Sequence, residues 1–377
     1  MLIYLTVIFI IYFGFLLVCM AGWQKFVKGK TRTSHRSQEF VSVVVAVRNE
    51  EGSISRLLTS LEVQDFARSN FEVIFVNDHS TDASAERIER WIKSNQQLQV
   101  RLLQSPGEGK KHALTEGIQR AKGEIILTTD ADCVLPPDWI STMVLSFNVD
   151  SDKATQETTM VVGSVKIQQD KSLFSKLQTL EFSSVMGTGV ALLEVGFPVM
   201  CNGASLAFRK KSFVAVNGYE GNLHIPSGDD EFLMRKLNEQ FPGSIKSIRS
   251  ASVVSTQPQT SLKKFIHQRL RWASKWKAND SWIAKSLALF IFIFQASGIM
   301  AMCLLFSKNY GMVVGGLLVG KFLLEGYLLF TVGKRLGHTF SIPSFLILQL
   351  VYPFYVISVG IFSQLFEYEW KGREGIF

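Results

Sequence analysis

The chain has 377 residues, of which 47% are hydrophobic, with a formal net charge of +8 and a mean hydropathy of +0.18. This average is too apolar for an ordinary soluble domain and too polar for a bundle that lies wholly in a membrane. The four cysteines form no CxxC pair and the six histidines are scattered, which argues against a disulfide framework, a structural zinc site and a histidine-based metal centre.

The chain opens with an uncharged apolar run over residues 2–20, about long enough to cross a bilayer. No basic region precedes it and no clear cleavage site follows it, so we interpret residues 1–23 as a transmembrane helix and not as a signal peptide. A basic linker, residues 24–39, follows directly; it carries Lys25, Lys28, Lys30, Arg32 and Arg36. By the positive-inside rule, this linker and the domain after it face the cytoplasm.

Residues 40–280 are predicted to form one α/β domain with a sizeable core. Nearly continuous β-branched and apolar runs predict strands that are buried on both faces, namely Val41–Val47, Phe71–Val76 and Glu124–Thr129. Helical patterns near 53–64, 82–95 and 110–121 alternate with these strands. This alternation predicts a mainly parallel sheet covered on both sides. A polar excursion near 148–158 leads to a further predicted strand, Met160–Ile167.

Residues 281–377 are predicted to form a C-terminal membrane region with two or three transmembrane helices, over 285–306, 312–332 and 344–366. Lys334 and Arg335, between the second and third segments, agree with a cytoplasmic position for that loop. The third segment contains Pro353 and has two interpretations. A full span places the C-terminal tail outside, whereas an interfacial or re-entrant element leaves it in the cytoplasm.

Polar or acidic residues follow three of the predicted strands, as Arg48–Glu51, Asn77–Asp78 and Asp130–Asp132. Ligands of open parallel sheets bind outside the carboxyl ends of the strands, so the three strand ends together predict a site for a cation and a polar ligand. Asp130 and Asp132 offer hard oxygen ligands, which suit Mg²⁺ or Mn²⁺ bridging carboxylates to phosphates. Such a pair alone occurs by chance in many chains, and the prediction depends on the convergence of all three strand ends.

Seven short motifs occur in order along the central domain: VSVVVAVRNEE (41–51), NDHSTD (77–82), GKKHAL (109–114), TTDADC (128–133), NGASLAFRK (202–210), GDDEF (228–232) and QRLRW (268–272). Together they resemble the family 2 glycosyltransferases of the GT-A fold, in the membrane-bound, cellulose-synthase-like branch. The resemblance covers roughly residues 40–280, and the flanking apolar segments also fit that branch. It implies a metal-dependent enzyme that moves a sugar from a nucleotide diphosphate donor, with UDP expected on family grounds.

The resemblance also implies roles for single residues. The donor nucleotide would be bound by Val47, Asn49, Glu50, Asp78, Lys110 and Asp130, with Asp78 near the base and Lys110 facing nucleotide or phosphate. Asp130 and Asp132 would flank the diphosphate, with Asp132 the more direct ligand of Mg²⁺ or Mn²⁺. The metal would offset the charge that builds up on the leaving nucleoside diphosphate.

Asp230 is the candidate general base, which would take the proton of the acceptor hydroxyl while attack inverts the anomeric centre. The family usually has Glu before Asp in this motif, whereas this chain has Asp229 before Asp230, so either aspartate remains a candidate base. The same acidic residues also suit the start of the helix that follows, where negative charge is favourable.

The QRLRW motif lies in a basic, aromatic-rich helical stretch from Leu262 to Lys277. The resemblance implies that Arg271 pairs with the diphosphate, that Trp272 stacks on a sugar near the acceptor, and that Gln268 belongs to the same site. It also places Asn202 and Gly203 in the wall around the acceptor or the donor sugar. The stretch fits an interfacial amphipathic helix as well, with its lysines and Trp276 at the lipid headgroups.

Other classes of function fit less well. A non-catalytic subunit predicts decay of the acidic residues, and a dehydrogenase needs a glycine-rich loop that the first strand lacks. Nucleic acid is not an expected partner, because the basic residues cluster beside apolar segments, where membrane lipid is the expected contact. Within glycosyl transfer, a processive polysaccharide synthase is the alternative. A polymer channel normally needs more membrane helices, so we favour a lipid or lipid-linked acceptor at a bacterial inner membrane.

Overall fold

The computed structural model describes residues 1–29, 39–147, 156–275, 281–365, 368–370 and 373–375. The chain divides into two compact units, and each is described by itself. The sheet unit comprises Phe26–Gln168 and Gly196–Gln257, and the helical unit comprises Met1–Lys25, Gln169–Val195 and Pro258–Phe377. Several predicted features lie outside the described residues: Lys30, Arg32, Arg36, Trp276, Lys277, most of the excursion near 148–158 and part of the C-terminal tail.

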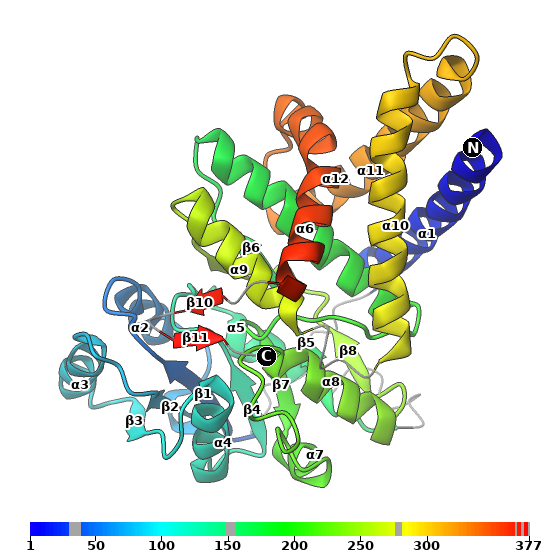
Figure 1. Cartoon of the computed structure of the whole chain (residues 1–377). Helices are drawn as coiled ribbons and strands as arrows, with labels where there is room; N and C mark the ends of the chain where they lie inside the picture. The colour runs from blue at the N-terminus through cyan, green and yellow to red at the C-terminus, as the bar shows by residue number, and fades with distance from the viewer. Residues whose placement is uncertain (30–38, 148–155, 276–280, 366–367, 371–372, 376–377) are drawn as a thin grey trace. The chain divides into compact units, whose positions relative to one another are not determined.

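The described part of the sheet unit is built on a seven-stranded sheet of order β3-β2-β1-β4-β7-β5-β8 (Figure 1). The strands are β1 (Val41–Val47), β2 (Phe71–Asn77), β3 (Gln99–Gln104), β4 (Ile125–Thr128), β5 (Met160–Val162), β7 (Leu206–Arg209) and β8 (Ile245–Ser247). β1 pairs in parallel with β2 and β4, while β7 runs antiparallel to β4 and β5. The mainly parallel sheet predicted from the sequence is confirmed, and it aligns the carboxyl ends of β1, β2 and β4 at one edge.

Helices connect and cover these strands. They are α2 (Ile54–Glu62), α3 (Ser84–Ser94), α4 (Lys110–Arg120), α5 (Trp139–Leu145), α7 (Lys210–Ala215) and α8 (Asp229–Gln240), with a 3₁₀ turn η1 (Arg68–Asn70). β1 and β2 are buried almost throughout, as their β-branched sequences predict. α4 lies directly on them, because a Cβ atom at Gly117 would be 2.4 Å from Cγ1 of Val44. This close contact packs α4 tightly against the face of the sheet.

The predicted strand Met160–Ile167 is wrong in its extent. Residues on either side of Gly163 form two separate strands, β5 and β6 (Ser164–Ile167), and β6 pairs in parallel with β9 (Val253–Thr256) instead of joining the large sheet. Gly163 donates its N–H to the Ser205 carbonyl at 2.8 Å, and a Cβ atom there would lie 2.0 Å from Ser205 Oγ. The chain therefore passes from the large sheet to the small one at Gly163, because only a residue without a side chain can lie this close to Ser205.

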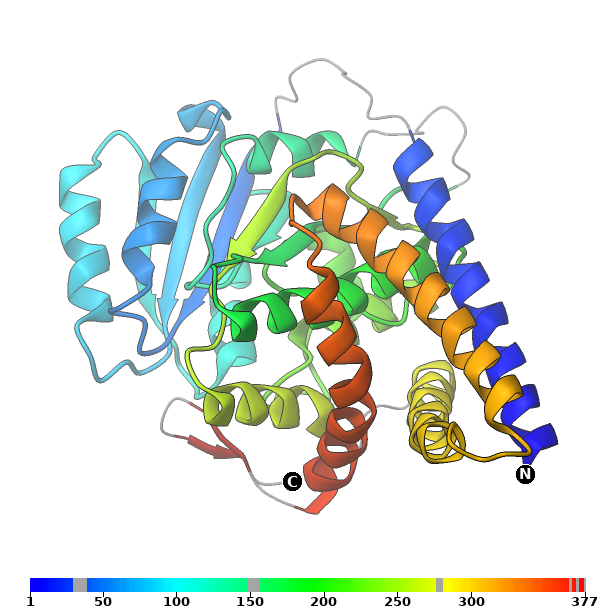
Figure 2. The ribbon, with the colours of Figure 1, turned by 90° about the horizontal axis from the view of Figure 1, so that it is seen from above.

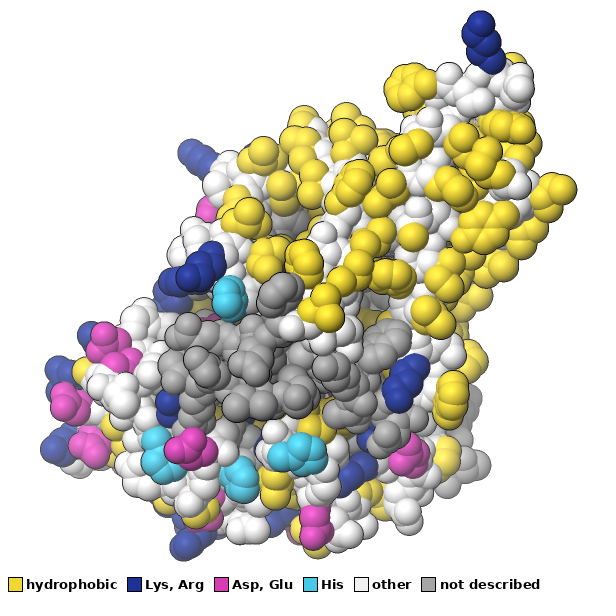
Figure 3. Space-filling model, viewed as in Figure 1, with side chains coloured by type: hydrophobic (Ala, Val, Ile, Leu, Met, Phe, Trp, Pro, Cys, Tyr) yellow, Lys and Arg dark blue, Asp and Glu magenta, His cyan; other side chains and the backbone are white. Residues whose placement is uncertain are grey.

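The helical unit contains, among the described residues, three helices and the greater part of a fourth that are long and apolar enough to cross a membrane. They are α10 (Trp282–Leu304), α11 (Gly311–Leu336), α12 (Ile342–Leu365) and α1 (Leu2–Lys28), whose last residues cluster with the sheet unit. Pro353 lies inside α12 without ending it. Apolar side chains cover much of the surface of these helices in Figure 3. Ile10, Leu289, Leu323 and Leu350 are examples of their exposed apolar residues. Such a surface suits lipid and not water, which indicates a membrane protein.

A buried polar cluster joins three of these helices. Lys321 of α11, only 6% exposed, pairs with Glu325 at 3.0 Å and also donates to Oε1 of Gln349 in α12. Gln349 Nε2 and the Tyr12 hydroxyl of α1 each donate to the Glu325 carboxylate at 2.6 Å. Figure 2 shows α1 and α11 side by side, as these contacts require. Charges within a membrane bundle are tolerated when they are paired in this way.

Two further helices and a small hairpin complete the described helical unit: α6 (Leu173–Glu194), α9 (Leu262–Ser274), β10 (Tyr368–Trp370) and β11 (Arg373–Gly375). Ser172 and Ser261 begin α6 and α9 as side-chain N-caps. α6 approaches its neighbours closely, since a Cβ atom at Gly22 would lie 2.1 Å from the Ala191 carbonyl oxygen. α6 and α9 lie within the predicted domain of residues 40–280, but in the structure they cluster with the apolar helices.

Candidate functional site

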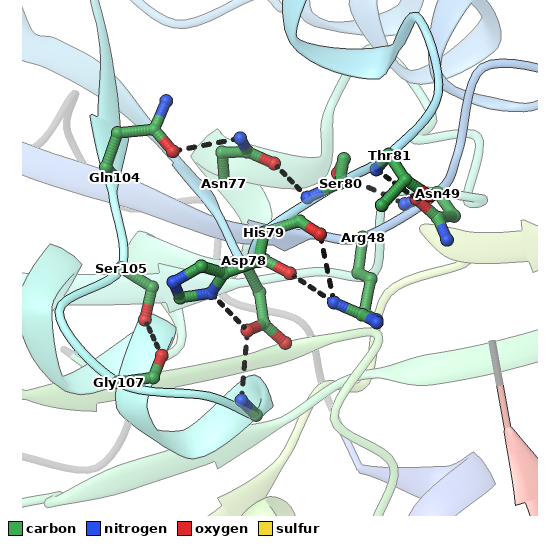
Figure 4. A network of polar contacts seen from close by, with 11 residues as sticks. Arg48, Asn49, Asn77, Asp78, His79, Ser80, Thr81, Gln104, Ser105 and Gly107 are labelled. Atoms are coloured by element: carbon green, nitrogen blue, oxygen red, sulfur yellow. Dashed lines mark hydrogen bonds and ion pairs between the residues drawn. The ribbon is translucent and has the colours of Figure 1, made fainter. Parts of the chain in front are cut away.

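Two loops after β1 and β2 are fastened to each other at the carboxyl edge of the sheet (Figure 4). Arg48 donates to the carbonyl oxygens of Asp78 and His79 at 2.9 and 3.0 Å. Asn49, whose φ of 51° lies in the left-handed region, accepts from the Thr81 N–H at 2.8 Å and donates its own N–H to Ser80 at 3.1 Å. The polar residues after the two strands thus build one rigid rim.

Glu50 and Val47 belong to the same rim in different ways. The Glu50 N–H donates to Ser84 Oγ at 2.7 Å, and its carboxylate accepts from the Ser53 hydroxyl. Val47 is buried at the end of β1, where its carbonyl accepts from the Asp78 N–H at 2.8 Å. Glu50 therefore places a carboxylate at the rim, whereas the Val47 side chain belongs to the core.

Asp78 connects this rim to α4. Its side chain is buried, with 1% exposed, and Oδ1 accepts from the Gly109 N–H at 2.9 Å (Figure 4). Gly109 has a φ of 102°, a conformation that favours glycine, and it immediately precedes α4. Asp78 thus holds the N-terminus of α4 at the strand ends, where α4 begins with Lys110.

Lys110 is the centre of the candidate site. Its Nζ lies 2.8 Å from Asp130 Oδ1 and 2.9 Å from Asp229 Oδ2, so one ammonium group joins the end of β4 to the start of α8. Gly203 closes the same space, because a Cβ atom there would lie 3.0 Å from Asp229 Oδ2 and 3.3 Å from Lys110 Nζ. Three motifs far apart in the sequence therefore meet within hydrogen-bonding distance.

Asp229 and Asp230 have different surroundings, although they are neighbours. Asp229 is buried and ion-paired with Lys110. Asp230 is partly exposed, and its two oxygens accept from the backbone N–H groups of Gly203 at 2.9 Å and Glu231 at 2.7 Å. Both residues lie in the first turn of α8, as the sequence indicated, and Gly228 in the left-handed conformation directs the chain into that helix.

Electrostatics within the site favour ionised groups. Burial would lower the pKa of Lys110, but Asp130 and Asp229 outweigh it and raise the pKa well above its ordinary value. Burial likewise opposes ionisation of Asp229, and the two lysines Lys110 and Lys111 reverse this and lower its pKa. Tyr219, buried beside Asp229, has its pKa raised by burial and by that carboxylate. Lys110 and Asp229 are therefore both charged at neutral pH.

The residues after β4 fit a hard divalent cation. Ligand atoms of Asp130, Asp132 and Cys133 all lie within 4.8 Å of one another. Carboxylate oxygens suit Mg²⁺ or Mn²⁺, whereas a cysteine sulfur suits softer ions. Cys133 is fully buried, and burial raises the pKa of its thiol. The acidic pair thus offers oxygen ligands that suit such a cation, and the Lys110 ammonium lies against one of them, Asp130.

The remaining predicted residues belong to the other unit or shape the backbone near the site. Gln268, Arg271 and Trp272 are on α9 and belong to the helical unit, not to the sheet unit. Asn202 accepts from the Ala204 N–H at 2.9 Å through its side chain and so shapes the turn that presents Gly203. Thr256 of β9 donates its hydroxyl hydrogen to the Asp132 carboxylate, with 3.3 Å between the two oxygens. The sequence gave no sign of this role, because no motif marks that strand.

Comparisons with known proteins point to one family of enzymes. The model of the glycosyl transferase family 2 matches residues 42–214. Poly-beta-1,6-N-acetyl-D-glucosamine synthase of Staphylococcus epidermidis is 27% identical over 270 residues, which cover 70% of this chain and 62% of the synthase. Undecaprenyl-phosphate 4-deoxy-4-formamido-L-arabinose transferase of Pseudomonas fluorescens is 28% identical over 161 residues, or 42% of this chain and 45% of the transferase. This chain thus spans less than two thirds of the length of either relative.

A solved structure shares the fold over almost the whole length. It is the mannosyltransferase of Pyrobaculum calidifontis, determined in complex with GDP-Man and Mn²⁺, and it is 19% identical to this chain with a TM-score of 0.56. The match covers 97% of this chain and 98% of the mannosyltransferase. It supports the GT-A fold with its mainly parallel sheet.

Proposed function

We propose that the chain is a member of glycosyl transferase family 2, whose model matches residues 42–214, and that it transfers a sugar from a nucleoside diphosphate donor to a lipid or lipid-linked acceptor. The observation that carries the proposal is the meeting of Lys110, Asp130 and Asp229 beside Asp230 at the carboxyl edge of the sheet. This arrangement supplies positive charge for a diphosphate, oxygens for a cation and a separate carboxylate for proton transfer.

The donor nucleotide is bound by the rim after β1 and β2. Asp78 and Glu50 contact the base and ribose side of a nucleotide, with UDP the expected carrier, and Asn49 keeps the first loop in place. Lys110 faces the diphosphate from the N-terminus of α4, where backbone N–H groups and the helix dipole also favour phosphate. When the donor binds, its diphosphate replaces part of the contact of Lys110 with Asp130 and Asp229.

Mg²⁺ or Mn²⁺ is part of the proposal, held by Asp132 and Asp130. When bound, such a cation supplies positive charge that offsets the charge on the departing nucleoside diphosphate. The Mn²⁺ in the Pyrobaculum calidifontis mannosyltransferase supports this assignment. Thr256 orients Asp132 by donating a hydrogen bond to its carboxylate.

Asp230 is the general base in this proposal. Asp229 is committed to Lys110 at 2.9 Å, whereas Asp230 is more exposed and is oriented by two backbone N–H groups from separate segments. A fixed carboxylate can accept the proton of the acceptor hydroxyl as the new glycosidic bond forms and the bond to the diphosphate breaks. Attack from the face opposite the leaving group would invert the anomeric centre.

The acceptor is proposed to approach from the membrane. Four apolar helices among the described residues support membrane insertion, and the Pseudomonas fluorescens relative acts, by its name, on undecaprenyl phosphate. Lys25, Lys28, Lys334 and Arg335 at the ends of α1 and α11 support a cytoplasmic sheet unit in a multi-pass protein of a bacterial inner membrane. On α9, Trp272 and Gln268 are proposed to contact the acceptor, and Arg271 is proposed to contact the diphosphate.

Polysaccharide synthesis is the second candidate. The match to the Staphylococcus epidermidis synthase extends over 70% of this chain, further than the match to the lipid-phosphate transferase, which covers 42%. In this case the acceptor would be the end of a growing glycan, and the same Asp230 would act on each added sugar.

The two candidates are separated by the product. Detergent-purified full-length protein is incubated with radiolabelled UDP- and GDP-sugars, Mn²⁺ or Mg²⁺, and a lipid extract of bacterial inner membranes. Label that moves into the organic phase with one donor, together with nucleoside diphosphate release, supports transfer to lipid. Label in water-soluble material of high molecular mass supports polymer synthesis instead. Nucleotide binding without release of nucleoside diphosphate from any donor would contradict both.

A further inference from the structure

Arg269 is a buried charged residue inside the QRLRW motif, and the family resemblance assigned it no role. It lies on α9 and is 3% exposed. Its Nε and Nη2 atoms lie 3.0 and 2.5 Å from the two carboxylate oxygens of Glu181 on α6, and Glu181 is 5% exposed. This two-pronged pairing uses the planar guanidinium in the geometry that an arginine alone provides.

The other side of the guanidinium contacts the motif. Nη1 of Arg269 donates to Gln268 Oε1 at 2.5 Å, and the guanidinium carbon lies 4.3 Å from the centroid of the Trp272 ring. The Phe265 ring lies on the same group at 4.4 Å. A single side chain thus contacts two of the three residues that characterise the motif, Gln268 and Trp272.

Glu181 is itself held in place by two neighbouring helices. The Tyr355 hydroxyl of α12 donates to Glu181 Oε1 at 3.2 Å, and α6, α9 and α12 lie together in Figure 1. One turn earlier on α6, Gln178 donates to the Gln259 carbonyl at 3.0 Å and accepts from its N–H at 2.8 Å. α6 therefore fixes both the segment that enters α9 and the arginine within it.

We propose that Glu181 and Arg269 form a positioning clamp that sets the orientation of Gln268 and Trp272 for the acceptor. The inference rests on the proposed function, in which these two motif residues serve the acceptor. A buried ion pair is a poor way to gain stability, since apolar side chains of similar volume often serve as well or better. Here the pair connects α6 and α12 to the motif through directed hydrogen bonds. Apolar side chains make no such directed contacts and would not orient Gln268.

The test separates positioning from folding with three variants of the full-length protein. Glu181→Gln keeps the shape of the side chain but removes its charge. Arg269→Lys keeps the charge but loses the planar guanidinium that binds both carboxylate oxygens. The double variant Glu181→Leu/Arg269→Met removes both charges, so that neither is left buried without a partner. Each is assayed for kcat and for the apparent KM of the lipid extract from bacterial inner membranes, and for donor hydrolysis without lipid.

All three variants are expected to lower kcat/KM for the lipid extract by roughly 10- to 100-fold, mainly through KM, because small misplacements of contact residues have effects of this size. Donor hydrolysis without lipid stays within about twofold of wild type, because the donor site is in the sheet unit. The double variant recovers a wild-type melting temperature but not the wild-type KM. Wild-type KM in the folded double variant would overturn the proposal and leave a purely structural ion pair.

The matched control is a second arginine–glutamate pair, in which the glutamate is buried and the arginine is partly exposed. Arg101 lies 2.7 Å from Glu72, which is 2% exposed, on β3 and β2 of the sheet unit. Glu72→Gln should lower the melting temperature without changing KM for the lipid extract, and an equal rise in KM would count against a specific clamp. Absence of donor hydrolysis in the wild type contradicts the proposed function itself, an outcome distinct from failure of the clamp.

Discussion

Lys110 determines the charge balance of the candidate site. Its ammonium group lies within 2.9 Å of both Asp130 and Asp229, and the backbone that places it is fixed by Asp78 through Gly109. Burial opposes the charge on Asp229, and Lys110 more than compensates and lowers the pKa of that carboxyl group. A group with a lowered folded-state pKa stabilises the protein above its unfolded pKa, and the stabilisation is lost as pH falls through the folded value.

Lys110→Met should therefore destabilise the protein in a pH-dependent way. Without the lysine, burial raises the pKa of Asp229, and the variant should lose about 3–5 kcal/mol near neutral pH because a buried carboxylate loses its ion-pair partner. The difference from wild type should shrink as pH falls, because Asp229 is protonated first in the folded variant, where its pKa is raised, and last in the folded wild type, where its pKa is lowered. Unfolding midpoints across this range measure the effect. Lys93→Met, at an exposed site on α3, is the control; parallel curves for both variants would contradict the argument.

Asp132→Asn tests the cation site at the same scale. Sugar transfer by wild type should stop in a chelator and return with Mn²⁺ or Mg²⁺, whereas the variant should lose on the order of 100-fold in rate, because a bound metal contributes several kcal/mol to transition-state stabilisation. Asp138→Asn, at the N-cap of α5, is the matched control and should keep wild-type rates. Wild-type activity that is insensitive to chelation would rule out the metal.

At the scale of elements, α6 differs most from what the sequence predicted. The predicted strand Val41–Val47 and the predicted helix starts near 53, 82 and 110 agree with β1, α2, α3 and α4 within about two residues, because periodicity and capping are local signals. α6 has no motif and no charge pattern of its own, and its role depends on contacts with distant helices. The same reason explains the misjudged strand 160–167, which Ser205 divides at Gly163.

Gly22→Val should separate α1 from α6. A Cβ atom at Gly22 would lie 2.1 Å from the Ala191 carbonyl oxygen, so the helices must move apart, at a cost of about 2 kcal/mol. Gly14→Val lies on the same helix, where no atom is within 4 Å of the corresponding position, and it serves as the control. The melting temperature in detergent should fall for the first variant and stay within error for the second. Equal melting temperatures would contradict the close packing.

At the scale of the whole molecule, the sequence correctly indicated a membrane protein with a GT-A domain. The uneven distribution of apolar residues carried the first prediction, and the seven ordered motifs carried the second. The candidate site was predicted only in part: the motif residues Lys110, Asp130 and Asp229 do meet, but the separation of roles between Asp229 and Asp230 needed the backbone contacts of Gly203 and Glu231. Such contacts between distant segments leave no periodic signal in a sequence.

Donor turnover by Asp230→Asn, measured beside wild type, tests the central claim most directly. Asparagine keeps the size of the side chain but cannot take a proton, so transfer to the lipid extract should fall by roughly 10²- to 10⁴-fold while nucleotide affinity and melting temperature change little. Both proteins must be purified free of host enzymes. Wild-type turnover by the Asp230→Asn variant would contradict the assignment of the general base and, with it, the mechanism built on this site.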